Sequence, residues 1–300
     1  MTISICKAPA PLSLVQQQLK KVCEELGLVY LDQDKMLRQG YNNLRTHRLP
    51  TAWSYSPSIS CYGAIKLRSP IDSAAEDFSH SVAELCGIDV PQSKIWNGFW
   101  HNGTHPIFSP VIGEKPERLE QITYEKRCVQ FAAPISAYIS AYLPYHVLVG
   151  VWDVHDQNFI VTSDKYATAE VKTNPIVYCC DNAGMSLEKL DDFFPSKSRS
   201  FWQDMIFTNN HFHLDLDEVA KSANKIASLS KDTLAGAVDT LFKYKDAKIH
   251  FGMRHQIIDE LSRRQDHIAA AYTSPTPCLN HLRKIFKCEP VTKPAAGLGS

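Results

Sequence analysis

The chain has 300 residues, of which 44% are hydrophobic and 21% charged, a composition typical of a soluble globular protein that forms one bilobal unit. Lysine plus arginine equals aspartate plus glutamate at 32 each, so no overall positive charge is available to hold nucleic acid or an anionic membrane surface. The 9 cysteines form no C-x-x-C pair and no run of about eighteen apolar residues occurs, so we expect a cytoplasmic, reducing compartment and no membrane span, with delivery into another cell left open.

The first predicted element is an amphipathic helix that ends at Gly27. Ser13 and Gln16 have the spacing of a capping box, and apolar residues follow at helical intervals. These apolar residues are Val15, Leu19, Val22 and Leu26. Residues 28–31 predict a short strand, and residues 32–50 predict a small helix and a loop.

The stretch 51–70 predicts a strand that contains a lysine. Lys66 stands inside the apolar and small-residue run CYGAIKL. A charged side chain at such a position needs a partner, unless it faces solvent from an edge strand. A helix is predicted next over residues 70–86, with Glu76 in its first turns and Gly87 as its C-terminal stop.

Two strands and two helices are predicted to follow this helix. The Asn102-Gly103 pair is a strong turn signal and predicts a hairpin, and Pro144 predicts a kink in the second of the two helices. The strands are expected at 94–100 and 105–111, and the helices at 114–130 and 132–150.

The residues with the clearest chemistry begin with the pattern D-x-H-x-x-N, formed by Asp153, His155 and Asn158. An apolar run precedes the pattern and Phe-Ile-Val follows it, so it is typical of a helix, a loop and a strand. A second apolar strand over 176–180 ends in Asp181, and a hairpin of the two strands would bring Asn158 and Asp181 side by side. Their oxygen atoms are ligands that suit Mg²⁺.

Asp153 lies five residues before Asn158, where a base could orient a hydroxyl toward the phosphate of a nucleotide held by that metal. This arrangement is the layout of phosphoryl transfer. The alternative is a solvated loop, because so short a pattern also occurs by chance.

The rest of the chain predicts a polar segment followed by helices. Residues 162–174 favour a projecting loop, and residues 186–205 combine aromatic residues with Lys197 and Arg199, as in a segment that meets substrate or in a surface loop. His211 and His213 are assigned no role. Helices are predicted at 219–229, 234–244, 253–271 and 279–286.

LVGVWDVHDQNF together with Asp-Asn before a glycine resembles the catalytic core of the atypical kinases, meaning the phosphatidylinositol 3- and 4-kinases and the HipA-type protein kinases. The resemblance implies that Asp153 is the catalytic base and that Asn158 and Asp181 bind the metal. His155 is placed with the catalytic residues and is expected to brace the loop by hydrogen bonding. Two departures occur: Val154 stands where the lipid kinases usually carry arginine, and Ala183 interrupts Asp-Asn-Gly.

The same resemblance gives roles to two residues nearer the N-terminus. AIK is similar to the kinase strand motif, which implies that Lys66 contacts nucleotide phosphates and pairs with a glutamate. The similarity of AEDFSHSVAELCGIDVP to a HipA segment makes Glu76 that partner, with Glu84 as the alternative. Residues 108–112 would lie beside the adenine. A glycine-rich loop is absent, so the serines at 54–60 are expected to cover phosphate.

These features predict an α+β, bilobal protein-kinase-like fold with a β-rich lobe over residues 1–110, a helical lobe over 111–288 and a flexible tail over 289–300. The expected cofactors are ATP and Mg²⁺. A protein serine or threonine is the expected acceptor, because the sequence carries no apolar anchor and no polybasic cluster. The alternatives are a phosphoinositide kinase and a catalytically weak pseudokinase that binds nucleotide and a protein partner.

Overall fold

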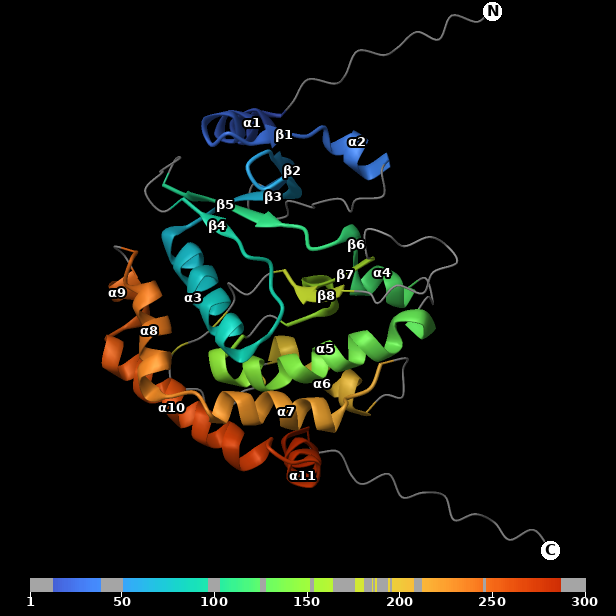
Figure 1. The fold of residues 1–300 in the computed structure, drawn as a ribbon, viewed down its shortest axis with the longest axis vertical. Coiled ribbons are helices and arrows are strands. Elements are labelled where there is room, and N and C mark those ends of the chain that lie inside the picture. Colours follow the sequence, from blue (N-terminus) through green and yellow to red (C-terminus); the bar gives the residue numbers. More distant parts are fainter. Residues whose placement is uncertain are drawn as a thin grey trace, which may run out of the picture.

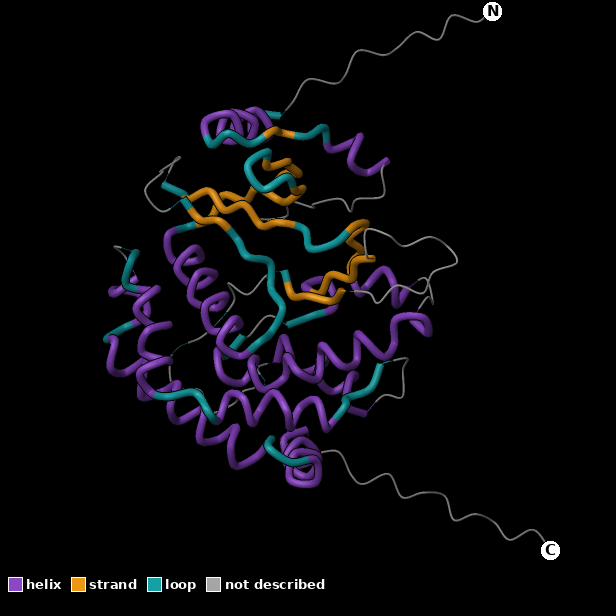
Figure 2. The backbone as a smooth tube through the Cα atoms, in the orientation of Figure 1, coloured by secondary structure: helices purple, strands orange, loops and turns teal. Residues whose placement is uncertain are grey.

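The structure is a computed structural model in which strands and helices occupy different regions, with the strands at the top of Figure 1 and most helices below them. The same division is visible by colour in Figure 2. The α+β class predicted from the sequence is confirmed. The structure describes residues 13–38, 51–96, 103–124, 128–151, 154–163, 176–180, 185, 187, 194, 196–207, 212–244 and 247–286.

An antiparallel five-stranded sheet, in the order β1-β2-β3-β5-β4, forms the upper part. Its strands are β1 Val29–Tyr30, β2 Thr51–Ser56, β3 Cys61–Arg68, β4 Lys94–Ile95 and β5 His105–Pro110. The predicted hairpin of the last two is present, although β4 is shorter than expected.

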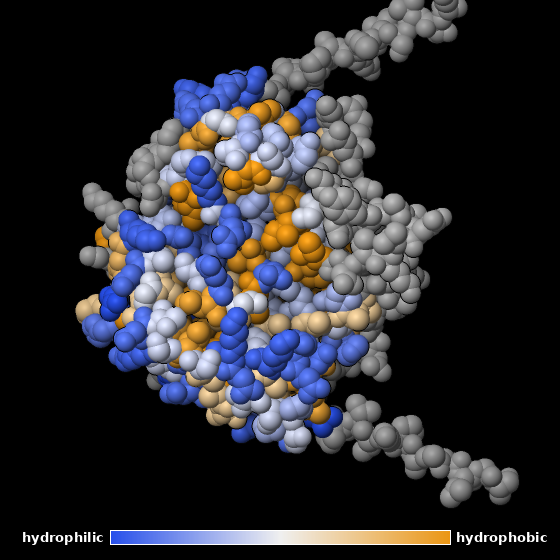
Figure 3. All heavy atoms as spheres, viewed as in Figure 1, coloured by the Kyte–Doolittle hydropathy of each residue, from blue (hydrophilic) through white to orange (hydrophobic). Residues whose placement is uncertain are grey.

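Helix α1 (Leu14–Glu25) covers one face of this sheet, and the short α2 (Gln33–Arg38) follows β1. The predicted capping box is confirmed, since Ser13 and Gln16 exchange side-chain and backbone hydrogen bonds. The outer surface of α1 is hydrophilic (Figure 3), and its apolar side joins a small core with the sheet. The core consists of Leu19, Val22, Cys23, Leu28, Ala52, Ile65, Leu67 and Phe108.

A second sheet lies below the first and corrects one prediction. It contains β6 Glu114–Arg118, β7 Phe159–Ser163 and β8 Ile176–Cys179, in that order. The predicted single helix over 114–130 is therefore wrong, because its first part is β6, Leu119–Tyr124 forms the short helix α4, and the residues from Cys128 onward belong to the next helix, α5. Pro116 explains the difference: proline breaks a helix interior but is tolerated in an edge strand, where β6 lies.

The other predicted helices are confirmed, and two further ones appear. The helices are α3 Pro70–Cys86, α5 Cys128–Val149, α6 Ser196–Phe207, α7 Leu216–Ala227, α8 Lys231–Leu241, α9 Ala247–Phe251, α10 Arg254–Ala271 and α11 Pro275–Phe286. Helix α6 falls in the segment that was expected to meet substrate or form a surface loop. Its Trp202 is fully buried and its Phe201 stacks on Phe159 at 5.3 Å, so these aromatic residues serve the core.

Helix α3 packs with the lower helices although it follows directly from β3 (Figure 1). Its Phe78 and Val82 are fully buried in the large core that α5, α7, α8 and α10 share. Two tyrosines fasten it further: the Tyr145 hydroxyl donates to the Ser79 carbonyl at 2.8 Å, and the Tyr244 hydroxyl donates to Asp77 at 3.3 Å. None of the described helices has the length and apolarity needed to cross a bilayer.

Two histidine rings meet where α11 docks against α10. The rings of His267 and His281 lie 4.9 Å apart, and both contact the buried ring of Tyr272. Burial lowers the pKa of His267 to about 4, and the positive charges of His281 and Arg263 add to the effect. Burial also lowers the pKa of His281, with a contribution from Lys284. The folded protein therefore favours both imidazoles in their neutral form.

We expect acid to weaken this contact. A lowered pKa in the folded state stabilises the protein above the usual histidine value of 6.5, and the benefit is lost as the pH falls toward the folded pKa of about 4. The free energy of unfolding should drop by roughly 1–2 kcal/mol from this pair, allowing for partial solvent exposure. Urea titrations at several pH values measure it. The double variant His267→Gln/His281→Gln should flatten the dependence, whereas the exposed control His255→Gln should not.

Candidate functional site

A buried ion pair joins β3 to α3. The Lys66 Nζ lies 3.6 Å from Oε1 of Glu76, and the two side chains are 9% and 1% exposed. Alternation along β3 explains the direction of Lys66, because Ile65 and Leu67 on either side of it are buried in the core beneath α1. The structure thus contains the expected pair, while the alternative Glu84 is exposed. The contact of Lys66 with phosphate stays a prediction.

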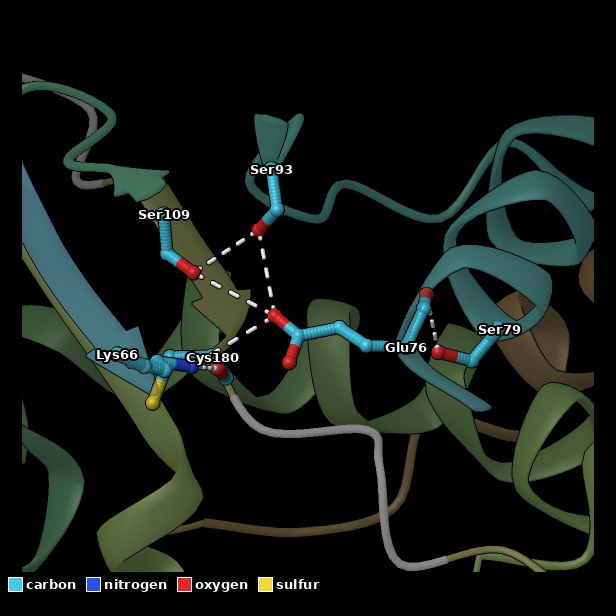
Figure 4. A network of polar contacts seen from close by, with 6 residues as sticks. All are labelled: Lys66, Glu76, Ser79, Ser93, Ser109 and Cys180. Carbon is cyan, nitrogen blue, oxygen red and sulfur yellow. Dashed lines mark hydrogen bonds and ion pairs between the residues drawn. The ribbon is translucent and has the colours of Figure 1, made fainter. Parts of the chain in front are cut away.

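Two serines hold Glu76 from the side opposite α3 (Figure 4). The hydroxyls of Ser93 and Ser109 donate to Oε1 of Glu76 at 3.3 and 3.4 Å, and they lie 2.9 Å from each other. Hydrogen bonds of this kind are required where a carboxylate is buried. The sequence carries no pattern that marks either serine, since one lies in a loop and the other in a strand 33 residues after Glu76.

The ion pair also touches the end of β8. Lys66 Nζ donates a hydrogen bond to the Cys180 carbonyl at 3.1 Å, and the Cys180 N–H donates to the Asn158 carbonyl at 2.8 Å. The predicted hairpin of β7 and β8 is present, with Phe159 opposite Cys179. Asn158 is thus beside the residue that precedes Asp181. Asp181 itself lies outside the described residues, so its assignment to the metal stays a prediction.

The loop before β7 is stabilised by His155. Its Nδ1 accepts a hydrogen bond from the Gln157 N–H at 3.2 Å and caps the short 3₁₀ turn Asp156–Asn158. Because Nδ1 is an acceptor, the proton of the neutral ring is on Nε2. The side-chain amide of Gln157 in turn donates from Nε2 to Oε1 of Glu120, in α4, at 3.1 Å. The hydrogen bond at Nδ1 agrees with the loop-bracing role that was expected of His155.

Of the two residues before His155, the structure describes Val154 but not Asp153. Asp153 lies outside the described residues, so its role as base stays a prediction. Val154 is buried in the large core, where an apolar side chain fits. Burial and the Glu120 carboxylate raise the pKa of the nearby Asp156.

A cavity of about 210 Å³ lies between the two sheets at this point. Its lining combines apolar walls with the side chains of Lys66, Arg68, Arg118, His155 and Asn158. The apolar part is formed by Trp53, Ala64, Pro91, Pro110, Val111, Pro116, Ile160 and Tyr178. Within the described lining three side chains are cationic and none is a carboxylate, and one of the three, Lys66, is paired with Glu76 behind it.

Residues 108–112 were predicted to lie beside an adenine, but only part of this segment lines the cavity. Phe108 is buried in the small core beneath α1 and does not line the cavity. Ser109, Pro110 and Val111 do line it, because they follow at the end of β5 where the chain passes from one sheet to the other.

The expectation that the serines at 54–60 cover phosphate is wrong. Strand β2 pairs Thr51 with Lys66 and Ser56 with Cys61, so the turn that carries Ser58 and Ser60 lies at the opposite end of the hairpin from the ion pair. Five residues of strand separate them by about 16 Å. The β2 residue opposite Lys66 is Thr51, which lines the cavity.

No family model and no curated protein matches the chain. Among solved structures it is similar to the Helicobacter pylori proinflammatory kinase CtkA, with 10% identity and a TM-score of 0.41 over 73% of this chain and 95% of that one. It is also similar to WaaP in complex with acyl carrier protein, with 12% identity and a TM-score of 0.34 over 80% of this chain and 98% of that one. At these TM-scores and identities neither likeness decides fold or function.

Proposed function

We propose that the protein is a kinase-type phosphotransferase that moves the γ-phosphoryl group of ATP to a hydroxyl. The observation that carries the proposal is the buried ion pair of Lys66 and Glu76, which opens into a cation-lined cavity beside Asn158 and Cys180. A lysine held by a glutamate next to the metal-binding end of a hairpin is the arrangement that positions and neutralises phosphates.

The residues around the cavity suit ATP and Mg²⁺. Apolar side chains from both sheets can enclose a base, and Lys66 supplies positive charge for the phosphates. The amide oxygen of Asn158 and the carboxylate of Asp181 would hold Mg²⁺, which neutralises phosphate charge when bound. The hydrogen bond from the Cys180 N–H to the Asn158 carbonyl supports this pairing, because it holds Asn158 beside the residue that precedes Asp181 in the sequence.

Each of the other predicted residues then has a task. Glu76 keeps Lys66 pointed into the cavity, and the two serines on Glu76 keep that carboxylate in place. His155 stabilises the loop, and Asp153 would accept or orient the acceptor hydroxyl. Because no step needs covalent attachment to the protein, catalysis consists of positioning and charge stabilisation.

The acceptor that we propose is a serine or threonine of a protein. The sequence lacks the apolar anchor or the cluster of basic residues with which an enzyme would bind a phosphoinositide surface. A lipid acceptor and a nucleotide-dependent adaptor without transfer are the competing outcomes of the test. The adaptor is favoured by the absence of a glycine-rich loop.

The test is transfer of radiolabel from γ-labelled ATP, with Mg²⁺, to a panel of proteins and to vesicles that contain phosphoinositides. We expect labelled protein and unlabelled lipid. Melting curves with ATP, with and without Mg²⁺, run beside it, because a ligand of the folded state raises the melting temperature. Asp181→Ala should remove the magnesium-dependent part of that rise. A melting shift without transfer to either acceptor would support the adaptor, and no shift at all would refute the proposal.

A further inference from the structure

A second cation follows Lys66 along the same face of β3. Ile65 and Leu67 are buried in the core beneath α1, whereas Ala64, Lys66 and Arg68 all line the cavity. This is the alternation of a strand whose two faces have different neighbours. Arg68 therefore faces the cavity for the same reason as Lys66 does.

The residues of β3 that line the cavity are apolar at one end of the cavity and cationic at the other. Gly63 pairs with Pro110, next to the point where the chain leaves the upper sheet, and Ala64 lies among the apolar lining residues. Lys66 and Arg68 come two and four residues further, which are steps of about 7 Å each. A nucleotide with its base at the apolar end would pass Lys66 first and reach Arg68 with its outermost phosphate.

The backbone at Arg68 is held on both sides. Arg68 pairs with His105 as the last residue of β3, and the next residue, Ser69, is the N-cap of α3. The Ser69 hydroxyl accepts from the Asp72 N–H at 3.1 Å and donates to the Asp72 carboxylate at 2.8 Å. A site carried by such a junction of strand and helix is placed more accurately than one on a loop.

We propose that Arg68 is a second phosphate-binding residue, which contacts the terminal phosphate of a nucleoside triphosphate beyond Lys66. This inference rests on the proposed function, because it requires a nucleotide in the cavity. A guanidinium suits the task, since its fixed fork of N–H groups can bind two phosphate oxygens at once. The consequence is selectivity: Arg68 would favour a triphosphate over a diphosphate, whereas Lys66 would serve both.

The experiment compares Arg68→Gln with Lys94→Gln, which removes one positive charge from an exposed position of the same sheet. Dissociation constants for ATP and ADP, each with Mg²⁺, are measured by titration calorimetry. Arg68→Gln should weaken ATP binding by about tenfold to a hundredfold, the value of a charge-assisted hydrogen bond. Its ADP affinity, and both affinities of Lys94→Gln, should stay within about threefold of the wild type.

Three results contradict the proposal in different ways. If Arg68→Gln loses equal affinity for ATP and ADP, or loses none, Arg68 does not contact the terminal phosphate. The proposed function would still stand in that case, because the wild type binds nucleotide. A wild type that binds neither nucleotide would overturn both. Arg68→Lys keeps the charge and is the control for a variant that fails to fold. It should retain part of the preference for ATP over ADP. If it retains the whole preference, the guanidinium fork is not used.

Discussion

Asp153→Ala should nearly abolish phosphoryl transfer and leave the binding of magnesium-ATP intact. Asp153 precedes the proposed metal ligand Asn158 by five residues, and in the proposed site it would act on the acceptor hydroxyl. Contributions of a base or a hydroxyl-orienting carboxylate amount to about a hundredfold to ten-thousandfold in rate. The measurements are the initial rate of label transfer and the rise in melting temperature with magnesium-ATP.

The loop contains its own control for this substitution. Asp156 is another carboxylate three residues away, and it does not line the cavity in the described structure. Asp156→Asn should therefore keep the transfer rate within about threefold of the wild type. An adaptor predicts a different pattern, in which the wild type and Asp153→Ala both transfer label at the background rate.

Lys66→Ala should lose nucleotide binding and also destabilise the protein. Removing the Lys66 ammonium group leaves the Glu76 carboxylate, which is 1% exposed, without its cationic partner. Breaking a buried ion pair by removing one member costs about 3–5 kcal/mol, and here two serine hydroxyls compensate part of that cost, so we expect the lower end. Urea unfolding measures the stability, and titration calorimetry measures ATP binding.

A double substitution separates these two effects. Lys66→Met/Glu76→Gln removes both charges at nearly constant volume, which is often neutral for stability. It should recover most of the stability that Lys66→Ala loses and still fail to bind ATP. If the double variant binds ATP as the wild type does, Lys66 is a structural residue and has no contact with phosphate.

Local patterns in the sequence were sufficient for the elements that carry the site. The lysine in an apolar strand, the helix that stops at Gly87 and the hairpin after D-x-H-x-x-N are all set by residues close together in the chain. Those patterns predicted β3, α3, β7 and β8, whereas the pairing of Lys66 with Glu76 was predicted from the resemblance to the atypical kinases.

What the sequence could not predict depends on distant partners. Pro116 is a local signal against a helix at 114–118, but the strand that forms there depends on pairing with β7, some forty residues later. The aromatic residues of α6 are buried by contacts with β7 and α5, which no local pattern reveals. Ser93 and Ser109 matter through Glu76 alone. The serine turn was misplaced because residues 51–56 are a strand of their own, which carries the turn to the far end of the hairpin.

The attachment of α3 to the lower helices has a consequence for the resting state of the protein. Swinging α3 outward would separate Lys66 from Glu76, but it would also uncover Phe78 and Val82, both fully buried. Exposing two such side chains costs about 4 kcal/mol, so only about one molecule in a thousand would have the helix swung outward at any moment. Switching by an outward movement of this helix is thus disfavoured, and the Lys66–Glu76 pair is expected to be formed before any ligand binds.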